Sequence, residues 1–203
     1  MAETTNFNKH TNSNPIQQYL INKFYKQIFS LLKPLKVETI LDAGCGEGFT
    51  LVKLQRAKIG KKVQGIDNSQ DAIKLAKKHY PSLPIEKGSI YNLPYKDSSY
   101  DLVIATEVLE HLDNPEKALN EIKRVASKYV LLTVPNEPLF TIANFMRGKY
   151  LKNFGNHPEH INHWSKRKFR NFVKKSGLRV STVKTPFPWT MVLAKKNGNG
   201  NLK

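Results

Sequence analysis

Apolar residues in this chain gather in short continuous runs that alternate with segments of helical periodicity. The continuous runs predict five strands, at residues 37–43, 62–67, 85–87, 100–105 and 129–134. Between them, apolar positions repeat every three or four residues and predict helices at 50–56, 70–79 and 115–125. Continuous apolar runs are typical of parallel strands that helices cover on both faces. The alternation therefore predicts an α/β fold with a doubly wound, mostly parallel sheet.

The two ends of the chain are polar and lie outside this pattern. Residues 1–13 predict a disordered tail, and residues 197–203 form a polar tail. Asn14 followed by Pro15 is typical of a helix start, and apolar positions at helical spacing continue from there. A length of 203 residues suits one α/β domain and is too short for two ordinary domains joined by a linker. We therefore expect one domain over residues 14–196.

A long irregular segment follows the fifth predicted strand. Residues 136–165 contain one predicted helix, at 140–146, and a histidine-rich stretch. Long loops on a scaffold of regular elements usually carry function, so we expect this insertion to be a lid over a site. After it, the pattern predicts a helix near 166–175 and two apolar strands at 178–183 and 189–194.

Three glycines at alternate positions follow the first predicted strand. Residues 40–48 read Ile-Leu-Asp-Ala-Gly-Cys-Gly-Glu-Gly, and a second acid ends the next strand. Glycine allows positive φ and a close approach of the backbone to a ligand, and a carboxylate offers two acceptor oxygens to the hydroxyls of a ribose. The third glycine comes one residue earlier than in the G-x-G-x-x-G of dinucleotide folds, where this chain has Phe49. The pattern predicts a nucleoside-cofactor pocket formed by Asp42, Gly44, Gly46, Gly48 and Asp67.

The spacing D-x-G-x-G-x-G resembles motif I of the class I S-adenosylmethionine (SAM) methyltransferases. Residues 100–112 resemble the motif that follows the cofactor pocket in the type 11 branch, which contains the ubiquinone-pathway O-methyltransferases. The resemblance covers residues 37–135 and implies SAM as cofactor and a Rossmann-like seven-stranded sheet that ends in an antiparallel strand. It also implies that Thr106 touches the cofactor through backbone atoms. Many relatives carry an acid after the third strand where this chain has Ser89 and Ile90, so either Ser89 replaces that acid or backbone groups hold the adenine.

Two glutamates and a histidine follow the fourth predicted strand. Glu107, Glu110 and His111 form the pattern E-x-x-E-H, in which one helical turn would place all three side chains on one face. Two carboxylates and an imidazole are typical ligands of a divalent cation. Some methyltransferases with this motif, including small-RNA 2′-O-methyltransferases, use it to bind a metal, whereas in many metal-free relatives it packs or caps the turn. Both interpretations stay open.

Three further histidines lie close together in the predicted lid, at 157, 160 and 163, beside Trp164. Imidazole is the commonest general base near neutral pH. His160 and His163 are placed like lid residues that face the methyl acceptor, and together with His111 they are the candidate bases. The alternative is structural, with a histidine bonded to the loop backbone, Trp164 as a core anchor and Ser165 as a helix cap.

The charge of the chain leaves the class of acceptor open. The net charge is +17, but lysines occur on nearly every predicted helix and no RNA-binding signature is present. A solvated surface, an anionic acceptor and RNA are three interpretations of this charge. Thr106 and Glu107 stand where enzymes that methylate amino groups of DNA bases carry N-P-P-Y or D-P-P-Y, which argues against DNA.

Three features that the sequence lacks indicate where in the cell the protein is located. No run approaches the ~18 consecutive apolar residues of a membrane span, and the N-terminus lacks the apolar core of a signal peptide. A single cysteine excludes an internal disulfide framework. We therefore expect a cytoplasmic protein without a membrane span; its oligomeric state stays open.

Transfer of a methyl group from a sulfonium is an in-line displacement that needs mainly alignment, which can supply ~7–11 kcal/mol of the barrier. The lack of an obvious nucleophile therefore does not count against an enzyme. We expect a SAM-dependent methyltransferase that acts on an oxygen of a small-molecule or glycan- or lipid-linked acceptor. A divalent cation would be a second cofactor if E-x-x-E-H is a ligand set. RNA methylation and a non-catalytic SAM-binding scaffold are the alternatives.

Overall fold

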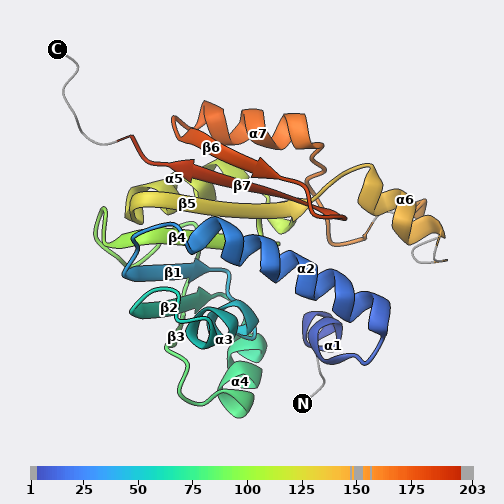
Figure 1. Ribbon diagram of the computed structural model, residues 1–203, viewed down its shortest axis with the longest axis horizontal. Coiled ribbons are helices and arrows are strands. Elements are labelled where there is room, and N and C mark those ends of the chain that lie inside the picture. The colour runs from blue at the N-terminus through green and yellow to red at the C-terminus, as the bar shows by residue number, and fades with distance from the viewer. Residues whose placement is uncertain (1–3, 147, 149–152, 156, 198–203) are drawn as a thin grey trace.

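The computed structural model describes residues 4–146, 148, 153–155 and 157–197. Its centre is a seven-stranded sheet of order β3-β2-β1-β4-β5-β7-β6 (Figure 1). β7 runs antiparallel to both of its neighbours, and the other pairs are parallel. The strands are β1 (Thr39–Ala43), β2 (Lys62–Asp67), β3 (Ile85–Lys87), β4 (Tyr100–Thr106), β5 (Ala126–Pro135), β6 (Arg179–Lys184) and β7 (Trp189–Lys195). The predicted mostly parallel sheet with an antiparallel C-terminal strand is confirmed.

Helices cover both faces of the sheet. One face carries α2 (Pro15–Leu32), α3 (Phe49–Arg56) and α4 (Gln70–His79), and the other carries α5 (Pro115–Val125) and α7 (Lys166–Lys175). Successive residues of a strand point to opposite faces, so Ile40 of β1 belongs to one core and Leu41 to the other. Both are fully buried, which explains why the strands have continuous apolar sequences.

Helix starts lie where the sequence predicts them. Asn14 Oδ1 accepts hydrogen bonds from two backbone N–H groups of α2, at 3.0 and 3.1 Å, and Pro15 is the first residue of that helix. Ser165 Oγ accepts a backbone N–H of α7 at 3.4 Å. These side chains provide partners for N–H groups that helix geometry leaves unpaired.

The N-terminal segment differs from the prediction. A disordered tail over residues 1–13 is wrong for Thr5–Thr11, which form helix α1. α1 lies beside the first turns of α2 (Figure 1), and the rings of Phe7 and His10 pack on Phe49 of α3 with centroid distances of 5.7 and 4.2 Å. A short polar segment has no readable periodicity, so only these tertiary contacts reveal the helix.

The predicted helix of the insertion is confirmed as α6 (Leu139–Met146), which projects beyond the carboxyl ends of the parallel strands (Figure 1). Residues 147, 149–152 and 156 of the insertion, and 198–203 of the expected C-terminal tail, lie outside the described residues. Within the described part of the chain, no helix combines the length and the apolar character needed to cross a bilayer.

Candidate functional site

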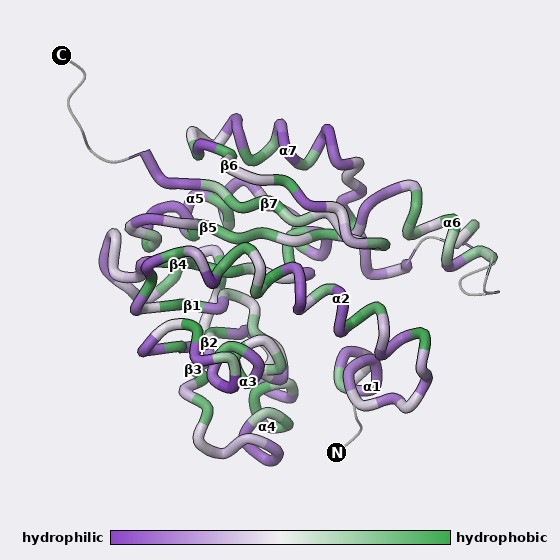
Figure 2. Tube along the Cα trace, in the orientation of Figure 1, coloured by the Kyte–Doolittle hydropathy of each residue, from purple (hydrophilic) through white to green (hydrophobic). Residues whose placement is uncertain are grey.

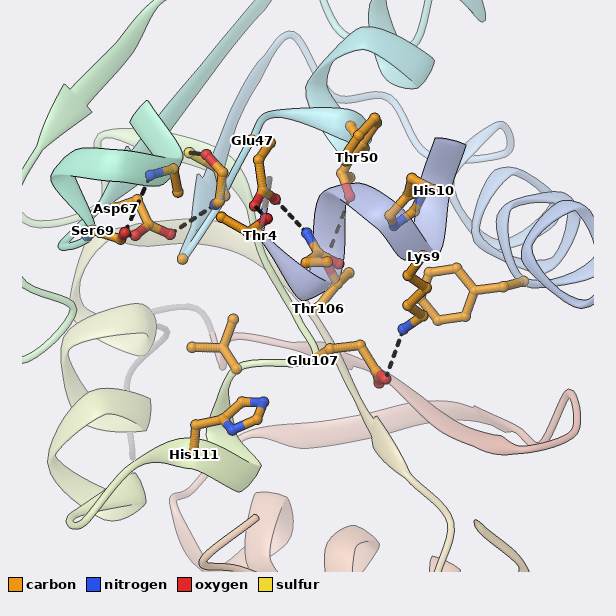
Figure 3. A pocket seen from close by; sticks show the side chains of 18 of the residues that line it. Thr4, Lys9, His10, Glu47, Thr50, Asp67, Ser69, Thr106, Glu107 and His111 are labelled. Atoms are coloured by element: carbon orange, nitrogen blue, oxygen red, sulfur yellow. Dashed lines mark hydrogen bonds and ion pairs between the residues drawn. The ribbon is translucent and has the colours of Figure 1, made fainter. Parts of the chain in front are cut away.

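A cavity of about 700 Å³ opens where β1, β2 and β4 end (Figure 3). Its walls come from the turn after β1, from the ends of β2 and β4, and from α1 and α2. Doubly wound folds bind their ligands at the carboxyl ends of such adjacent strands. Its lining includes the side chains of Lys9, Asp67, Thr106, Glu107, His111 and Trp189.

The three glycines of the turn have different roles. Gly44 and Gly46 line the cavity with φ of 82° and 50°, whereas Gly48 precedes α3 with φ of 79° and does not line it. A Cβ on Gly44 would lie 2.6 Å from a methyl carbon of Val108, but one on Gly46 would meet only Asn6, at 3.6 Å. Gly44 therefore permits close packing of the chain, and Gly46 keeps the backbone open to a ligand.

Asp67 joins the ends of the first two strands. Its Oδ2 accepts the N–H of Gly46 at 2.7 Å, and its Oδ1 accepts the N–H of Ser69 at 2.8 Å. Each carboxylate oxygen has two lone pairs, so both retain acceptor capacity toward the cavity. The backbone contacts fix the carboxylate, and the remaining lone pairs suit two neighbouring hydroxyl groups of a ribose.

Asp42 is a buried acid at the carboxyl end of β1. It is 1% exposed, and neither carboxylate oxygen has a hydrogen-bond partner among the described residues. Burial, with a smaller contribution from Asp67, raises the pKa of Asp42 to about 7. A buried carboxylate without donors is unfavourable, so a cationic ligand in the neighbouring cavity would stabilise it.

The other predicted cofactor residues divide into two groups. Thr106 ends β4 and lines the cavity, with its Oγ1 3.5 Å from that of Thr50. Ser89 and Ile90 do not line it: Ser89 Oγ accepts the N–H of Tyr91 at 3.2 Å, and Ile90 packs in the core. The structure therefore brings Thr106 to the site and leaves the Ser89–Ile90 pair outside the cavity wall.

A second cavity of about 390 Å³ adjoins the first. The residues that line both cavities include Lys9, Glu107, His111 and Trp189. The insertion supplies part of the remaining wall of the second cavity, with Phe140, Asn144, His157 and His160. The two cavities thus meet where β4 ends and β7 begins, under the segment that the sequence predicts as a lid.

The two glutamates of E-x-x-E-H have different surroundings. Glu107 has φ of 58°, a left-handed conformation that is uncommon outside glycine, and its Oε2 accepts the Nε1–H of Trp189 at 2.6 Å. Glu110 is 1% exposed, and neither carboxylate oxygen has a partner in the described residues. Burial and the nearby Glu107 raise the pKa of Glu110 well above its usual range. The expected common face is wrong for Glu107, because only Leu109–His111 form a helical turn, of the 3₁₀ type.

One cluster of metal-ligating side chains occurs within the described ranges. Ligand atoms of Glu110, His111 and His160 all lie within 4.8 Å of one another. Burial, helped by the neighbouring His111, lowers the pKa of His160 to about 3, so this imidazole is neutral at pH 7. Neutral imidazoles and carboxylates are typical metal ligands. His160 therefore joins the candidate metal set, and Glu107 lies outside it.

The tautomer of His111 follows from its hydrogen bond. Its Nδ1 is 2.9 Å from the backbone carbonyl oxygen of Glu159. Because a carbonyl oxygen only accepts, Nδ1 carries the hydrogen and the neutral ring presents Nε2 as an acceptor. His111 therefore has one nitrogen available as a base or as a metal ligand.

The remaining residues of the histidine-rich stretch have structural contacts. His163 lines neither cavity, and its Nδ1 lies 3.7 Å from Glu137 Oε1. Trp164 packs on Phe169 and Phe172 with centroid distances of 5.4 and 5.3 Å. The core-anchor interpretation of Trp164 is thus confirmed, and among the three lid histidines only His160 belongs to the metal-ligating cluster.

Sequence reasoning missed two residues where the cavities meet. Lys9 of α1 forms an ion pair with Glu107 (dashed line in Figure 3), with Nζ 3.8 Å from Oε2. The same Nζ lies 5.5 Å from the ring centre of Trp189. Nothing in the polar N-terminal sequence distinguishes Lys9 from the other lysines. The position of Trp189 directly after a proline, at the start of the last predicted strand, was the one available signal.

Residues 41–132 match the model of a methyltransferase domain family. The chain is 36% identical over 98 residues to norajmaline N-methyltransferase of Rauvolfia serpentina, an alignment that covers 45% of this chain and 33% of that protein. It is 38% identical over 86 residues to the mitochondrial ubiquinone biosynthesis O-methyltransferase of Saccharomyces cerevisiae, covering 40% and 27%. The chain thus spans about a third of the length of these two relatives.

Among solved structures, the chain is similar to the magnesium protoporphyrin IX methyltransferase of Synechocystis with bound SAH. The TM-score is 0.68 at 16% identity, and the likeness covers 96% of this chain and 95% of that one. At this identity the likeness concerns the fold alone. The comparisons therefore confirm the predicted fold and the family resemblance.

Proposed function

We propose that this chain, which carries a class I SAM-dependent methyltransferase domain, transfers the methyl group of SAM to an oxygen of an acceptor in the smaller cavity. One observation carries the proposal. A cavity with the glycine turn and Asp67 on one side shares lining residues with a second cavity whose wall contains three imidazoles, those of His111, His157 and His160. The first cavity has the groups that would bind a nucleoside, and the second has imidazoles that could remove a proton.

The charges of the larger cavity suit SAM, which carries a positive sulfonium and an ammonium group. Asp67 would accept the ribose hydroxyls through its free lone pairs, and the backbone at Gly46 would lie against the ligand. Asp42 is buried and Glu107 is half-buried, and burial raises the pKa of both acids. A cationic ligand favours their ionised forms, so cofactor binding and these carboxylates would stabilise each other.

The proton of the acceptor hydroxyl would go to His111. Its Nδ1 is bonded to the carbonyl oxygen of Glu159, and the lone pair of Nε2 can then accept a proton. Burial lowers the pKa of His160 to about 3, so this imidazole is a poor base and is suited to orienting the acceptor. His163 lines neither cavity and has no part in this proposal. The methyl group would pass in line from sulfur to oxygen where the two cavities meet.

A nitrogen acceptor is the competing assignment, because one of the relatives is named as an N-methyltransferase. A neutral amine attacks with its lone pair and needs no base in the transfer step, whereas a hydroxyl group becomes a good nucleophile only when its proton leaves. The neighbouring imidazoles of His111 and His160 at the second cavity therefore favour oxygen.

A divalent cation is a second candidate component. The carboxylate oxygens of Glu110 are buried without a hydrogen-bond partner in the described residues, and a cation would satisfy them. Glu110, His111 and His160 would hold it, and when bound it would lower the pKa of a hydroxyl group that it contacts. In that case His111 would be a ligand rather than the base.

The cofactor and the acceptor atom are tested with purified protein. Calorimetric titration with SAM should give a micromolar Kd, about −8 kcal/mol. Radiolabelled SAM is then offered with a catechol, a long-chain phenol and a primary amine as probes. We expect label in the phenolic products. Binding of NADH in place of SAM would overturn the cofactor, and label in the amine alone would overturn the oxygen acceptor.

The cation is tested by removing it. Transfer is measured before and after excess EDTA, and again after Mg²⁺ or Mn²⁺ is restored. If the three-residue cluster holds a required cation, EDTA abolishes transfer while SAM affinity stays within about twofold of its initial value. Full activity in EDTA would leave His111 as the base without a metal.

A further inference from the structure

Exposed apolar side chains of this molecule gather at one end. Nine large hydrophobic residues are exposed within the described ranges, and they occur at the start of α2, on α6, in the segment after it, and in the turn before β7. All of these segments lie at the carboxyl end of the parallel strands, where both cavities open (Figure 1). The residues are Ile16, Tyr19, Leu139, Ile142, Phe145, Met146, Phe154, Ile161 and Phe187.

Helix α6 has its apolar side turned outward. Leu139, Ile142 and Phe145 recur at a spacing of three and are exposed, and Met146 is 81% exposed. Asn144 is the buried residue of this helix, and its Nδ2 donates to the carbonyl oxygen of Gly155 at 3.2 Å. A surface helix normally buries its apolar stripe. Figure 2 shows α6 as a largely hydrophobic element that projects from the body of the protein.

Positive charge is concentrated in the same part of the sequence. Residues 138–184 contain 11 Lys and Arg but a single acid, Glu159. Six of these basic residues lie on α7, all of them exposed, and α7 begins on the side of the sheet from which α6 projects (Figure 1). Although lysines occur on nearly every helix, the net positive charge is therefore unevenly distributed along the chain.

We propose that the face formed by α6 and the first turn of α7, here called the docking face, binds an anionic lipid surface and presents the acceptor cavity to it. Exposed apolar side chains flanked by Lys and Arg are the pattern of proteins that lie on a membrane surface. The acceptor is then a lipid or an amphiphile whose hydroxyl group enters the smaller cavity. This part rests on the proposed function, and the binding itself does not. RNA would account for the basic residues but not for an outward apolar stripe.

Binding is measured by flotation with vesicles of phosphatidylcholine alone and of equimolar phosphatidylcholine and phosphatidylglycerol. We expect the protein to float with the mixed vesicles and to remain in solution with the neutral ones. The double variant Ile142→Ser and Met146→Ser should reduce the partition coefficient by about tenfold. Both side chains are exposed, and an unchanged melting temperature and SAM affinity would verify that the fold is intact.

The basic contribution is tested with a matched pair of charge variants. Arg167→Gln with Lys168→Gln should lower partitioning by about fivefold per residue. Lys33→Gln with Lys36→Gln removes the same charge from exposed residues before β1, at the opposite end of the molecule, and should change it by less than about twofold. Equal effects of the two pairs would mean unspecific charge attraction and would overturn the docking face.

Two other outcomes also overturn the inference. In the first, the wild-type protein stays in solution with both kinds of vesicle. In the second, the protein binds an oligouridine RNA tightly and does not bind vesicles, and the Ile142→Ser, Met146→Ser variant binds the RNA as tightly as the wild type. If vesicle binding fails while labelled methyl still reaches the phenol probes, the proposed function stands without the docking face. If vesicles bind but no SAM is bound, the proposed function fails alone.

Discussion

The cofactor end and the acceptor end of this site are built in different ways. At the cofactor end, the backbone N–H groups of Gly44 and Cys45 both bond to the carbonyl oxygen of Ile66, at 2.8 and 3.1 Å, so two paired strands fix the turn. At the acceptor end, the N–H groups of Ile161 and Asn162 bond to the carbonyl oxygen of Glu110, across about fifty residues of sequence. The first end depends on strand pairing, and the second on a few contacts of a long insertion.

This difference between the two ends indicates which residues can be substituted without loss of activity. Where backbone groups position a ligand, most side chains nearby are replaceable and only those with a charge toward the ligand matter. Where side chains from distant segments meet, each of them is a separate condition for activity. The predictions that follow test this contrast in order of the expected effect.

The largest effect is expected at the acceptor end. His111→Ala should reduce kcat by about 10²–10⁴-fold, because the proposed base is lost, while the Kd for SAM stays within about twofold. His163→Ala, which removes an imidazole that lines neither cavity, is the matched control and should keep at least half of the activity. Steady-state kinetics and calorimetry check both. Equal turnover of the two variants would leave alignment alone as the source of catalysis.

The next effect belongs to the cofactor end. Asp67→Ala removes two charge-assisted hydrogen bonds to the ribose, each worth about 1.5–3 kcal/mol before water replaces them, so we expect the Kd for SAM to rise by about a hundredfold. A fall in kcat at saturating SAM should be small by comparison. Because Asp67 also binds Gly46 and Ser69, a melting curve of the variant is required. An unchanged Kd would contradict the assignment of the ribose site.

At the cofactor end, the raised pKa of Asp42 predicts a pH-dependent change in folding stability that can be measured without a ligand. Unfolded Asp42 ionises near its usual pKa of about 4, whereas the folded pKa is about 7. The contribution of Asp42 to the stability of the ligand-free protein therefore falls as pH rises from 4 to 7 and is constant above. Asp42→Asn should be as stable as the wild type near pH 4 and about 1–4 kcal/mol more stable at pH 8. Urea unfolding at both pH values measures this, and a difference that does not vary with pH would contradict it.

The smallest effect is expected for the residue that joins the two ends. Lys9→Met removes the ion pair with Glu107, whose two side chains are 35% and 22% exposed, and such a pair contributes less than about 1 kcal/mol. We expect a change of about threefold in the Kd for SAM, and Lys9→Arg should restore it. A loss larger than tenfold would give Lys9 a direct role toward the ligand.

The sequence located the glycine turn and its partner acid Asp67, because their signals are local. Glycines after a strand and an acid at the end of the next strand specify a turn and its partner, and parallel pairing of β1 with β2 brings them together. The candidate metal set was predicted only in part, because Glu107 adopts a left-handed backbone that no helical spacing describes. His160 replaces it through packing of the insertion, which sequence patterns do not encode.

The N-terminal helix could not be predicted for a related reason. Seven residues are too few for a periodic signal, and the apolar side chain of Phe7 is stabilised only by Phe49 and other residues far along the chain. The placement of Ser89 and Ile90 also depends on tertiary contacts. The resemblance to relatives pointed to the segment after β3, but a bridge between Ser89 and Asn92 turns this segment along the core.

One wall of the cofactor cavity is the N-terminal segment with helix α1, and this has a kinetic consequence. Thr4 and Asn6 both hydrogen-bond to the carboxylate of Glu47 in the glycine turn, and α1 lines the cavity without belonging to the sheet. Detaching it breaks the contacts of a few residues and leaves both cores folded, which makes it the kind of segment that opens by local unfolding. If the cofactor product leaves past α1, its residence time depends on how often α1 detaches, and a substitution that weakens the contacts of α1 would alter product release without altering the chemical step.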